Sequence, residues 1–263
     1  MTYTHGHHHS VLDAHATRTA AGSAAYLLPH LRPEWSLLDV GSGPGTITLD
    51  LAEVVSSVTG VESSEAAIDA ARANARERGD TTTTFQLGDA HALPFPDASF
   101  DVVHAHQVFH HLADPVRAMR EMGRVCRPGG LVAVREVDYG PMTWFPASDG
   151  ISKWLEVYRT LARANGAEPD AGRRLRSWAN EAGFLQVRAS ASVWCYATTE
   201  ETAWWGNSQA DRVANSSFAE QAGAHGLATA EELREMTDAW RSWGADPDAW
   251  FVMVHGEILA TVD

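Results

Sequence analysis

The residues with the clearest chemical potential lie in three short segments, each at the end of an apolar run. The first is residues 37–45, LLDVGSGPG, where the run ends in a glycine-rich turn. Glycine has no Cβ, so the backbone can turn sharply and approach a ligand closely. Glu62 and Asp89 end the next two runs. The Glu62 carboxylate could accept two ribose hydroxyls in a fork, and Asp89 could accept an exocyclic amino group beside the small Ala90.

Each segment also has a plainer interpretation. The glycines could form a tight turn, Glu62 could be a solvated acid at a helix start, and Asp89 could belong to a Gly-Asp turn. We favour the ligand interpretation, because the glycine turn and both acids occur together and in order.

Histidines gather after a later apolar run, at positions 104, 106, 110 and 111. A neutral histidine can accept a proton near pH 7, so His110 and His111 are the candidate catalytic bases. Alternatively, each packs or meets solvent. His104 lies within the run and is predicted to be structural. The amino-terminal histidines 5, 7, 8, 9 and 15 are predicted to be a solvated tail, and no metal site is expected, because sequence neighbours seldom fix ligand geometry.

Alternating hydrophobic patterns predict the elements that hold these residues. Apolar runs at 37–40, 57–61, 84–87, 100–104 and 131–137 alternate with amphipathic stretches at 46–54, 64–78, 114–125 and 151–164. This rhythm is typical of βαβ units and a parallel sheet. Further on, a helix is predicted at 171–182, strands at 185–196 and 250–261, and helices at 200–222 and 230–243. The whole predicts an α/β fold with a doubly wound, mostly parallel, seven-stranded sheet.

Four regions are predicted around that sheet. Residues 1–34 form an amino-terminal helical lid, with a helix over 10–31 and Tyr26 facing the pocket. Residues 35–198 form the ligand-binding core, 199–248 a helical cap rich in tryptophan, and 249–263 the final core strand. Residues 139–150 are predicted to be a loop at the carboxyl edge of the sheet, where Trp144 and Phe145 line a substrate pocket or, alternatively, plug the cap.

Composition excludes several classes of function. The net charge of −14 repels phosphate backbones, so nucleic acid is not an expected partner. The two cysteines, Cys126 and Cys195, have no paired spacing that would indicate a disulfide framework or a zinc knuckle. No apolar run approaches the ~20 residues that span a bilayer. No export or transit signal is visible, so a cytoplasmic location is expected.

The ordered segments LLDVGSGPG, GVESS, GDAHALPFPDASFDVV, HQVFHHL and RVCRPGG resemble the class I S-adenosylmethionine-dependent methyltransferases. The resemblance covers about residues 36–138 and is greatest to the ubiquinone and menaquinone C-methyltransferases. It implies S-adenosylmethionine as cofactor and S-adenosylhomocysteine as product. It also implies residue roles: the methionine part near Gly41, Ser42, Gly43 and Gly45 with support from Asp39, ribose at Glu62 and Ser63, adenine at Asp89 and Ala90, and further cofactor contacts from His106 and Gln107.

Methyl transfer is an in-line displacement, so holding donor and acceptor in line supplies much of the acceleration and a base is optional. The expected substrate is a small organic molecule, and carbon, oxygen and nitrogen acceptors stay open. A cyclase on the same fold that keeps the cofactor structurally is the alternative function. A nicotinamide oxidoreductase is disfavoured by GxGxG in place of GxGxxG, and a non-catalytic binding protein by the intact glycine turn and ribose acid.

Overall fold

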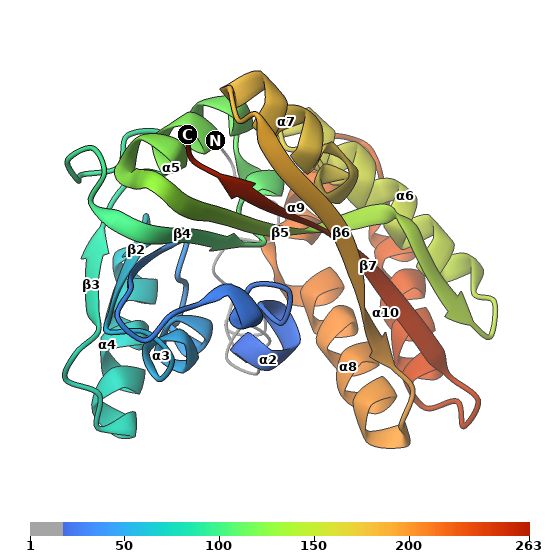
Figure 1. Ribbon diagram of the computed structural model, residues 1–263. Coiled ribbons are helices and arrows are strands. Elements are labelled where there is room, and N and C mark those ends of the chain that lie inside the picture. The colour runs from blue at the N-terminus through green and yellow to red at the C-terminus, as the bar shows by residue number, and fades with distance from the viewer. Residues whose placement is uncertain (1–17) are drawn as a thin grey trace. The chain divides into compact units, whose positions relative to one another are not determined.

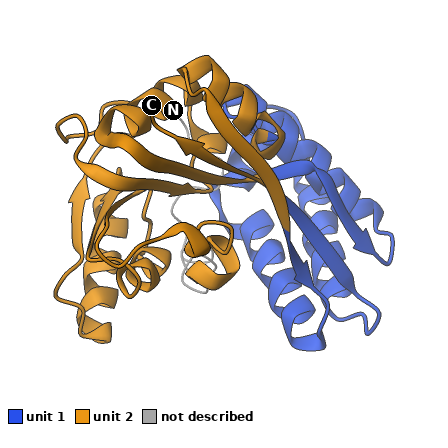
Figure 2. Cartoon of the chain, in the orientation of Figure 1, with its two compact units in different colours: residues 1–14, 138–170, 193–254 blue, residues 15–137, 171–192, 255–263 orange. Residues whose placement is uncertain are grey.

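The computed structural model describes residues 18–263 (Figure 1). Its contacts divide the chain into two compact units (Figure 2). Unit 1 contains Asp138–Asp170 and Val193–Val254, and unit 2 contains the described residues up to Val137, Ala171–Ser192 and His255–Asp263. Within residues 18–263, no helix is long and apolar enough to cross a membrane.

A seven-stranded sheet has the order β3-β2-β1-β4-β5-β7-β6. Its strands are β1 Ser36–Val40, β2 Ser57–Glu62, β3 Thr84–Leu87, β4 Phe100–His106, β5 Cys126–Phe145, β6 Gln186–Tyr196 and β7 Trp250–Thr261. Each of the pairs β1–β2, β1–β4, β2–β3 and β4–β5 is parallel. Val40 at the end of β1 is in register with Val61 of β2 and Ala105 of β4. The glycine turn, Glu62 and His106 therefore leave the sheet at one edge, and the predicted fold class is confirmed.

In unit 2, helices cover both faces of the sheet (Figure 1). On one face lie α2 Ala20–Ser23, α3 Thr46–Ala52 and α4 Glu65–Arg78, and on the other α5 Pro115–Val125 and α7 Leu175–Ala182. Ser64 caps α4 and Asp114 caps α5, each by accepting a hydrogen bond from a first-turn backbone N–H. The caps explain why both helices begin where sequence predicts.

Unit 1 contains α6 Asp149–Ala164, α8 Thr199–Asn215, α9 Ser217–Ala224 and α10 Ala230–Gly244. Capping boxes begin α8 and α10, where Thr198 pairs with Glu201 and Thr229 with Glu232. The unit is packed with aromatic rings: Trp154 contacts Trp240 edge-to-face at 5.1 Å between centroids. The aromatic enrichment expected of residues 199–248 is thus core packing in this unit.

Several elements differ from the predicted ones. Residues 10–31 were expected to be one helix; residues 10–17 lie outside the described part, and from residue 18 on there are only α2 and the 3-10 turn η1 Leu28–His30, which starts beside Pro29. A break at Ser216 splits the helix expected over 200–222, because its extended backbone lets its hydroxyl cap α9. Residues 171–182 begin as a 3-10 turn, η3 Ala171–Arg174.

The predicted loop over 139–150 is wrong. β5 continues to Phe145, and α6 begins at Asp149. The physical reason is visible in the burial pattern, in which Met142 is buried between exposed Pro141 and Thr143, as in a strand with one covered face. The bounds of the four predicted regions are not tested by these elements and stay predictions.

Candidate active site

The turn after β1 depends on glycine. Gly41, Gly43 and Gly45 have φ of 72°, 52° and 81°. These values lie in the left-handed region, where a residue that carries a Cβ is strained. The N–H groups of Gly41 and Ser42 donate to the Val61 carbonyl at 2.7 and 3.1 Å, which folds the turn over the end of β2. Gly45 is the N-cap of α3, so the turn ends in a helix start. The Ser42 hydroxyl is buried and has no hydrogen-bond partner among the described residues.

Gly41 also carries a steric requirement that Gly43 lacks. A Cβ on Gly41 would overlap Val108 Cγ2, whereas a Cβ on Gly43 would meet nothing within 4 Å. Gly43→Ala is therefore expected to cost about 1–2 kcal/mol of unfolding free energy from backbone strain alone. Gly41→Ala should cost more, because the stiff Val108 must also move. Urea denaturation of the two variants checks this, and equal losses would contradict the close approach.

Asp39 supports the turn from inside the sheet. Its carboxylate accepts the Thr48 hydroxyl at 2.6 Å and lies 2.8 Å from His104 Nδ1. All three side chains are buried in unit 2. Thr48 belongs to α3 and His104 to β4, so this carboxylate ties the helix after the turn to the neighbouring strand. The contacts of Asp39 and His104 are thus within the protein, and the predicted cofactor role of Asp39 stays a prediction.

Glu62 connects the turn to the end of β2. Its Oε2 accepts the Gly43 N–H at 3.2 Å. Its Oε1 accepts the Ser63 N–H at 2.6 Å, the Ser63 hydroxyl at 3.0 Å and the Ser64 N–H at 3.2 Å. Three donors on one oxygen fix the carboxylate, while the other oxygen has a single long contact from the glycine turn. The arrangement leaves Oε2 able to accept further hydroxyl donors.

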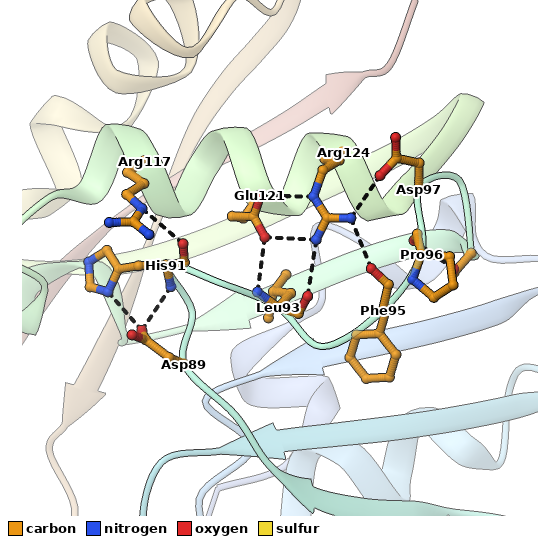
Figure 3. A network of polar contacts seen from close by, with 10 residues as sticks. Asp89, His91, Leu93, Phe95, Pro96, Asp97, Arg117, Glu121 and Arg124 are labelled. Carbon is orange, nitrogen blue, oxygen red and sulfur yellow. Dashed lines mark hydrogen bonds and ion pairs between the residues drawn. The ribbon is translucent and has the colours of Figure 1, made fainter.

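Asp89 follows β3 in a tight turn (Figure 3). Its Oδ1 accepts the His91 N–H at 2.9 Å and lies 2.8 Å from His91 Nδ1. The backbone N–H of His91 is the main cause that lowers the pKa of Asp89, so the side chain is a carboxylate at neutral pH. Ala90 packs on the core beside it. Further along, Arg124 of α5 donates to the carbonyls of Leu93 and Phe95 at 3.0 and 2.9 Å and holds this segment in place.

His106 and Gln107 lie where β4 ends. Gln107 has φ of 54°, and such strain in a non-glycine residue concentrates at functional sites. Its amide oxygen accepts Arg18 Nη2 at 2.7 Å, and its amide nitrogen lies 2.8 Å from His255 Nε2. The His106 ring stacks on His255 with centroids 6.3 Å apart. Burial, reinforced by Arg18, lowers the pKa of His106 well below its ordinary value, so this ring is neutral.

His110 lies in the 3-10 turn η2 Phe109–His111, and Glu136 of β5 organises that turn. Glu136 Oε1 accepts the backbone N–H groups of Val108 and Phe109, and Oε2 lies 2.7 Å from His110 Nδ1. Both side chains are buried. Burial raises the pKa of Glu136 to about 8 and lowers the pKa of His110 to about 3. The His111 ring lies 3.6 Å from the His110 ring between centroids, and burial lowers its pKa well below the ordinary value too.

Tyr26 lies between α2 and η1 in unit 2. Its hydroxyl is buried and has no hydrogen-bond partner among residues 18–263. Burial, and then the nearby Glu257 carboxylate, raise the pKa of Tyr26 well above its ordinary value. The phenol is therefore a neutral group that can donate a hydrogen bond.

Trp144 and Phe145 belong to unit 1, whereas every other predicted site residue belongs to unit 2. Trp144 stacks on Phe251 with centroids 6.1 Å apart. Phe145 is 58% exposed, and its carbonyl accepts Trp243 Nε1 at 3.0 Å. Their predicted role in the substrate pocket stays a prediction.

Sequence reasoning missed Arg18, Glu136 and His255. Glu136 carried a signal, since it is an acid inside the apolar run 131–137, and a buried acid needs a partner. Arg18 and His255 carried none, because they join Gln107 from 89 and 148 residues away. Among residues 18–263, no group of three or more His, Cys, Asp or Glu side chains could hold a metal ion.

Comparison with known proteins assigns the family. Residues 38–134 match the methyltransferase domain family. An uncharacterized methyltransferase of Schizosaccharomyces pombe is 34% identical to this chain over 98% of this chain and 96% of its own length. The chain belongs to the methyltransferase family. A demethylmenaquinone methyltransferase of Beutenbergia cavernae is 33% identical to this methyltransferase over 59% of the chain and 64% of its own.

The fold also matches solved structures. The YcgJ protein of Bacillus subtilis superposes with a TM-score of 0.58 at 20% identity, covering 97% of this chain and 100% of its own. The resemblance predicted from the motifs is thereby confirmed, and the enzyme is an S-adenosylmethionine-dependent methyltransferase. The unit 2 residues fit that cofactor: the turn offers an orphaned Ser42 hydroxyl, Glu62 keeps one oxygen for hydroxyl donors, and Asp89 is an exposed carboxylate.

Proposed function

We propose that this methyltransferase transfers a methyl group to a small organic acceptor, and that His110, supported by Glu136, takes the acceptor's proton. The observation that carries the proposal is the buried hydrogen bond between His110 Nδ1 and Glu136 Oε2, 2.7 Å long. A histidine held by a carboxylate is oriented, and the carboxylate stabilises the imidazolium that forms when the ring takes a proton. When bound, S-adenosylmethionine supplies an already activated methyl group.

The position of the pair supports this role. Val108, two residues before His110, lies where a Cβ of Gly41 would be, so the η2 turn packs directly against the glycine turn. Both turns lie at the carboxyl edge of β1 and β4, where ligands bind in doubly wound folds. A proton acceptor on η2 is therefore next to the predicted methionine site.

The proton balance follows from the chemistry of the pair. With one proton, the pair holds it between Oε2 and Nδ1, and the second ring nitrogen, Nε2, keeps its lone pair. The acceptor atom forms a bond to the methyl carbon, the carbon–sulfur bond breaks, and the acceptor's proton goes to Nε2. The positive charge that arrives is balanced by Glu136. Any acceptor with an acidic O–H, N–H or activated C–H satisfies this scheme.

The cofactor contacts are assigned by the same proposal. Glu62 and Ser63 hold the ribose, Asp89 and Ala90 the adenine, and the turn from Gly41 to Gly45 the methionine part, with His106 and Gln107 closing the site. Tyr26 donates from its neutral phenol to an oxygen of the acceptor. The half-buried cation Arg18 and the strained Gln107 support a polar acceptor group near the end of β4.

A product screen tests the proposal. The enzyme is incubated with S-adenosylmethionine carrying a deuterated methyl group and with a panel of phenols, naphthoquinols, carboxylic acids and amines. We expect one class to gain the labelled methyl while S-adenosylhomocysteine forms in equal amount. His110→Asn should lose the activity and keep affinity for S-adenosylhomocysteine. Conversion of a substrate without gain of label would instead indicate the cyclase, and full activity of His110→Asn would refute the base.

A further inference from the structure

His91 makes contacts that the proposed function does not use (Figure 3). Its backbone N–H donates to Asp89 Oδ1 at 2.9 Å, and its ring Nδ1 lies 2.8 Å from the same oxygen. A carboxylate oxygen only accepts hydrogen bonds, so Nδ1 carries the ring proton. One residue thus places two donors on a single oxygen of Asp89.

The two donors remove a freedom that Asp89 would otherwise have. The Asp89 side chain is 66% exposed, and an exposed aspartate normally samples several rotamers. Two donors on Oδ1, from different directions, fix both side-chain torsions. Oδ2 has no hydrogen bond to any of the residues the structure describes, so it is the oxygen presented to a ligand.

Two hydrogen bonds hold the backbone around His91 in place. Arg117 Nε, from α5, donates to the His91 carbonyl at 2.9 Å. The Ala92 N–H donates to the Asp89 carbonyl at 2.9 Å and closes the turn. The ring atom Nε2 is buried, although it has no hydrogen-bond partner within residues 18–263. A rigid donor is therefore placed beside an exposed acceptor.

We propose that His91 is a positioning residue that fixes Asp89 so that Oδ2 accepts the amino group of adenine. His91 would thereby set the preference for adenine over a base with a carbonyl at that position. An amino group donates a hydrogen bond to the carboxylate. A carbonyl oxygen is an acceptor like the carboxylate, so the two groups repel each other. The inference rests on the proposed assignment of Asp89 to the adenine.

Calorimetric affinities for two ligands separate positioning from mere folding. S-adenosylhomocysteine has the amino group, and S-inosylhomocysteine has a carbonyl in its place. In His91→Ala we expect affinity for the first to fall roughly tenfold, the worth of about one net hydrogen bond, and affinity for the second to change less than about twofold. His91→Asn should restore most of the loss, since its amide nitrogen is as many bonds from Cα as Nδ1.

The outcomes are distinct. A parallel loss of both ligands in His91→Ala, or no loss of either, overturns the positioning role while the adenine assignment of Asp89 stands. Failure of His91→Asn to restore affinity also counts against it. If the wild-type enzyme binds neither ligand, the cofactor site assigned under the proposed function is itself wrong, and the inference falls with it.

Discussion

Glu62→Gln is expected to weaken S-adenosylhomocysteine binding by about a hundredfold, as two hydrogen bonds to a charged acceptor are lost. The glutamine has nearly the shape of Glu62 but offers one acceptor oxygen and one donor nitrogen. The three donors of Ser63 and Ser64 require the oxygen on their side. The amide nitrogen then faces the Gly43 N–H and the ribose hydroxyls, where only an acceptor fits. Isothermal titration calorimetry measures the effect.

Glu65→Gln is the matched control for that experiment. Glu65 lies three residues along, in the exposed first turn of α4, and the substitution removes the same charge. Its affinity for S-adenosylhomocysteine should stay within about twofold of wild type, because exposed charges interact weakly. A similar loss in both variants would show a general charge effect, and no loss in Glu62→Gln would refute the ribose assignment.

The parts of this fold that sequence predicted are those with local signals. β3 and β7 have the predicted bounds, since each is rich in residues that favour strands and each follows turn residues in the sequence. α4 and α5 begin after Ser64 and Asp114, which are strong capping residues. The glycine turn could be predicted because closely spaced glycines allow a sharp turn, and all three have positive φ in the structure. Each of these features is decided within a few residues of chain.

The parts that sequence missed depend on tertiary contacts. β5 continues through Pro141 and Gly140, residues that normally end a strand, because Met142 is buried in unit 1. The turn at 109–111 is organised by a carboxylate that comes 26 residues later than His110. Neither the sequence of the η2 turn nor the apolar run 131–137 indicates that His110 and Glu136 meet. Their pairing is a property of the β4–β5 register, where His106 lies opposite Arg135.

Glu136→Gln should abolish the proposed base while it preserves the turn. The glutamine oxygen can accept the N–H groups of Val108 and Phe109, so η2 keeps its acceptor. The amide nitrogen then donates to His110 Nδ1, which forces the ring proton onto Nε2. A ring protonated at Nε2 cannot accept the proton of the substrate. We expect kcat to fall about 10²–10⁴-fold, the usual contribution of a general base.

The pH profile gives the same pair a second signature. The pKa of Glu136 is raised to about 8, so the folded enzyme takes up a proton as the pH falls through that value. A base works in its deprotonated form; the kcat of the wild-type enzyme should therefore rise with pH and level off above about 8. The same raised pKa affects stability. The contribution of Glu136 to folding is fully present at a pH below the pKa that this group has in the unfolded chain, and it is lost as the pH rises through the folded-state pKa of about 8. Glu136→Gln should lose both dependences.

Nuclear magnetic resonance of the histidine rings tests the assignment without any acceptor. In the wild type, the His110 ring nitrogens should respond to pH near 8, and in Glu136→Gln they should report an Nε2-protonated neutral ring throughout. His111→Asn is the control variant. The Glu136 carboxyl group, which balances the charge, contacts His110 at Nδ1, so this substitution leaves that hydrogen bond in place. An unchanged kcat in Glu136→Gln, with the ring tautomer switched as expected, would mean that the enzyme relies on alignment of donor and acceptor alone.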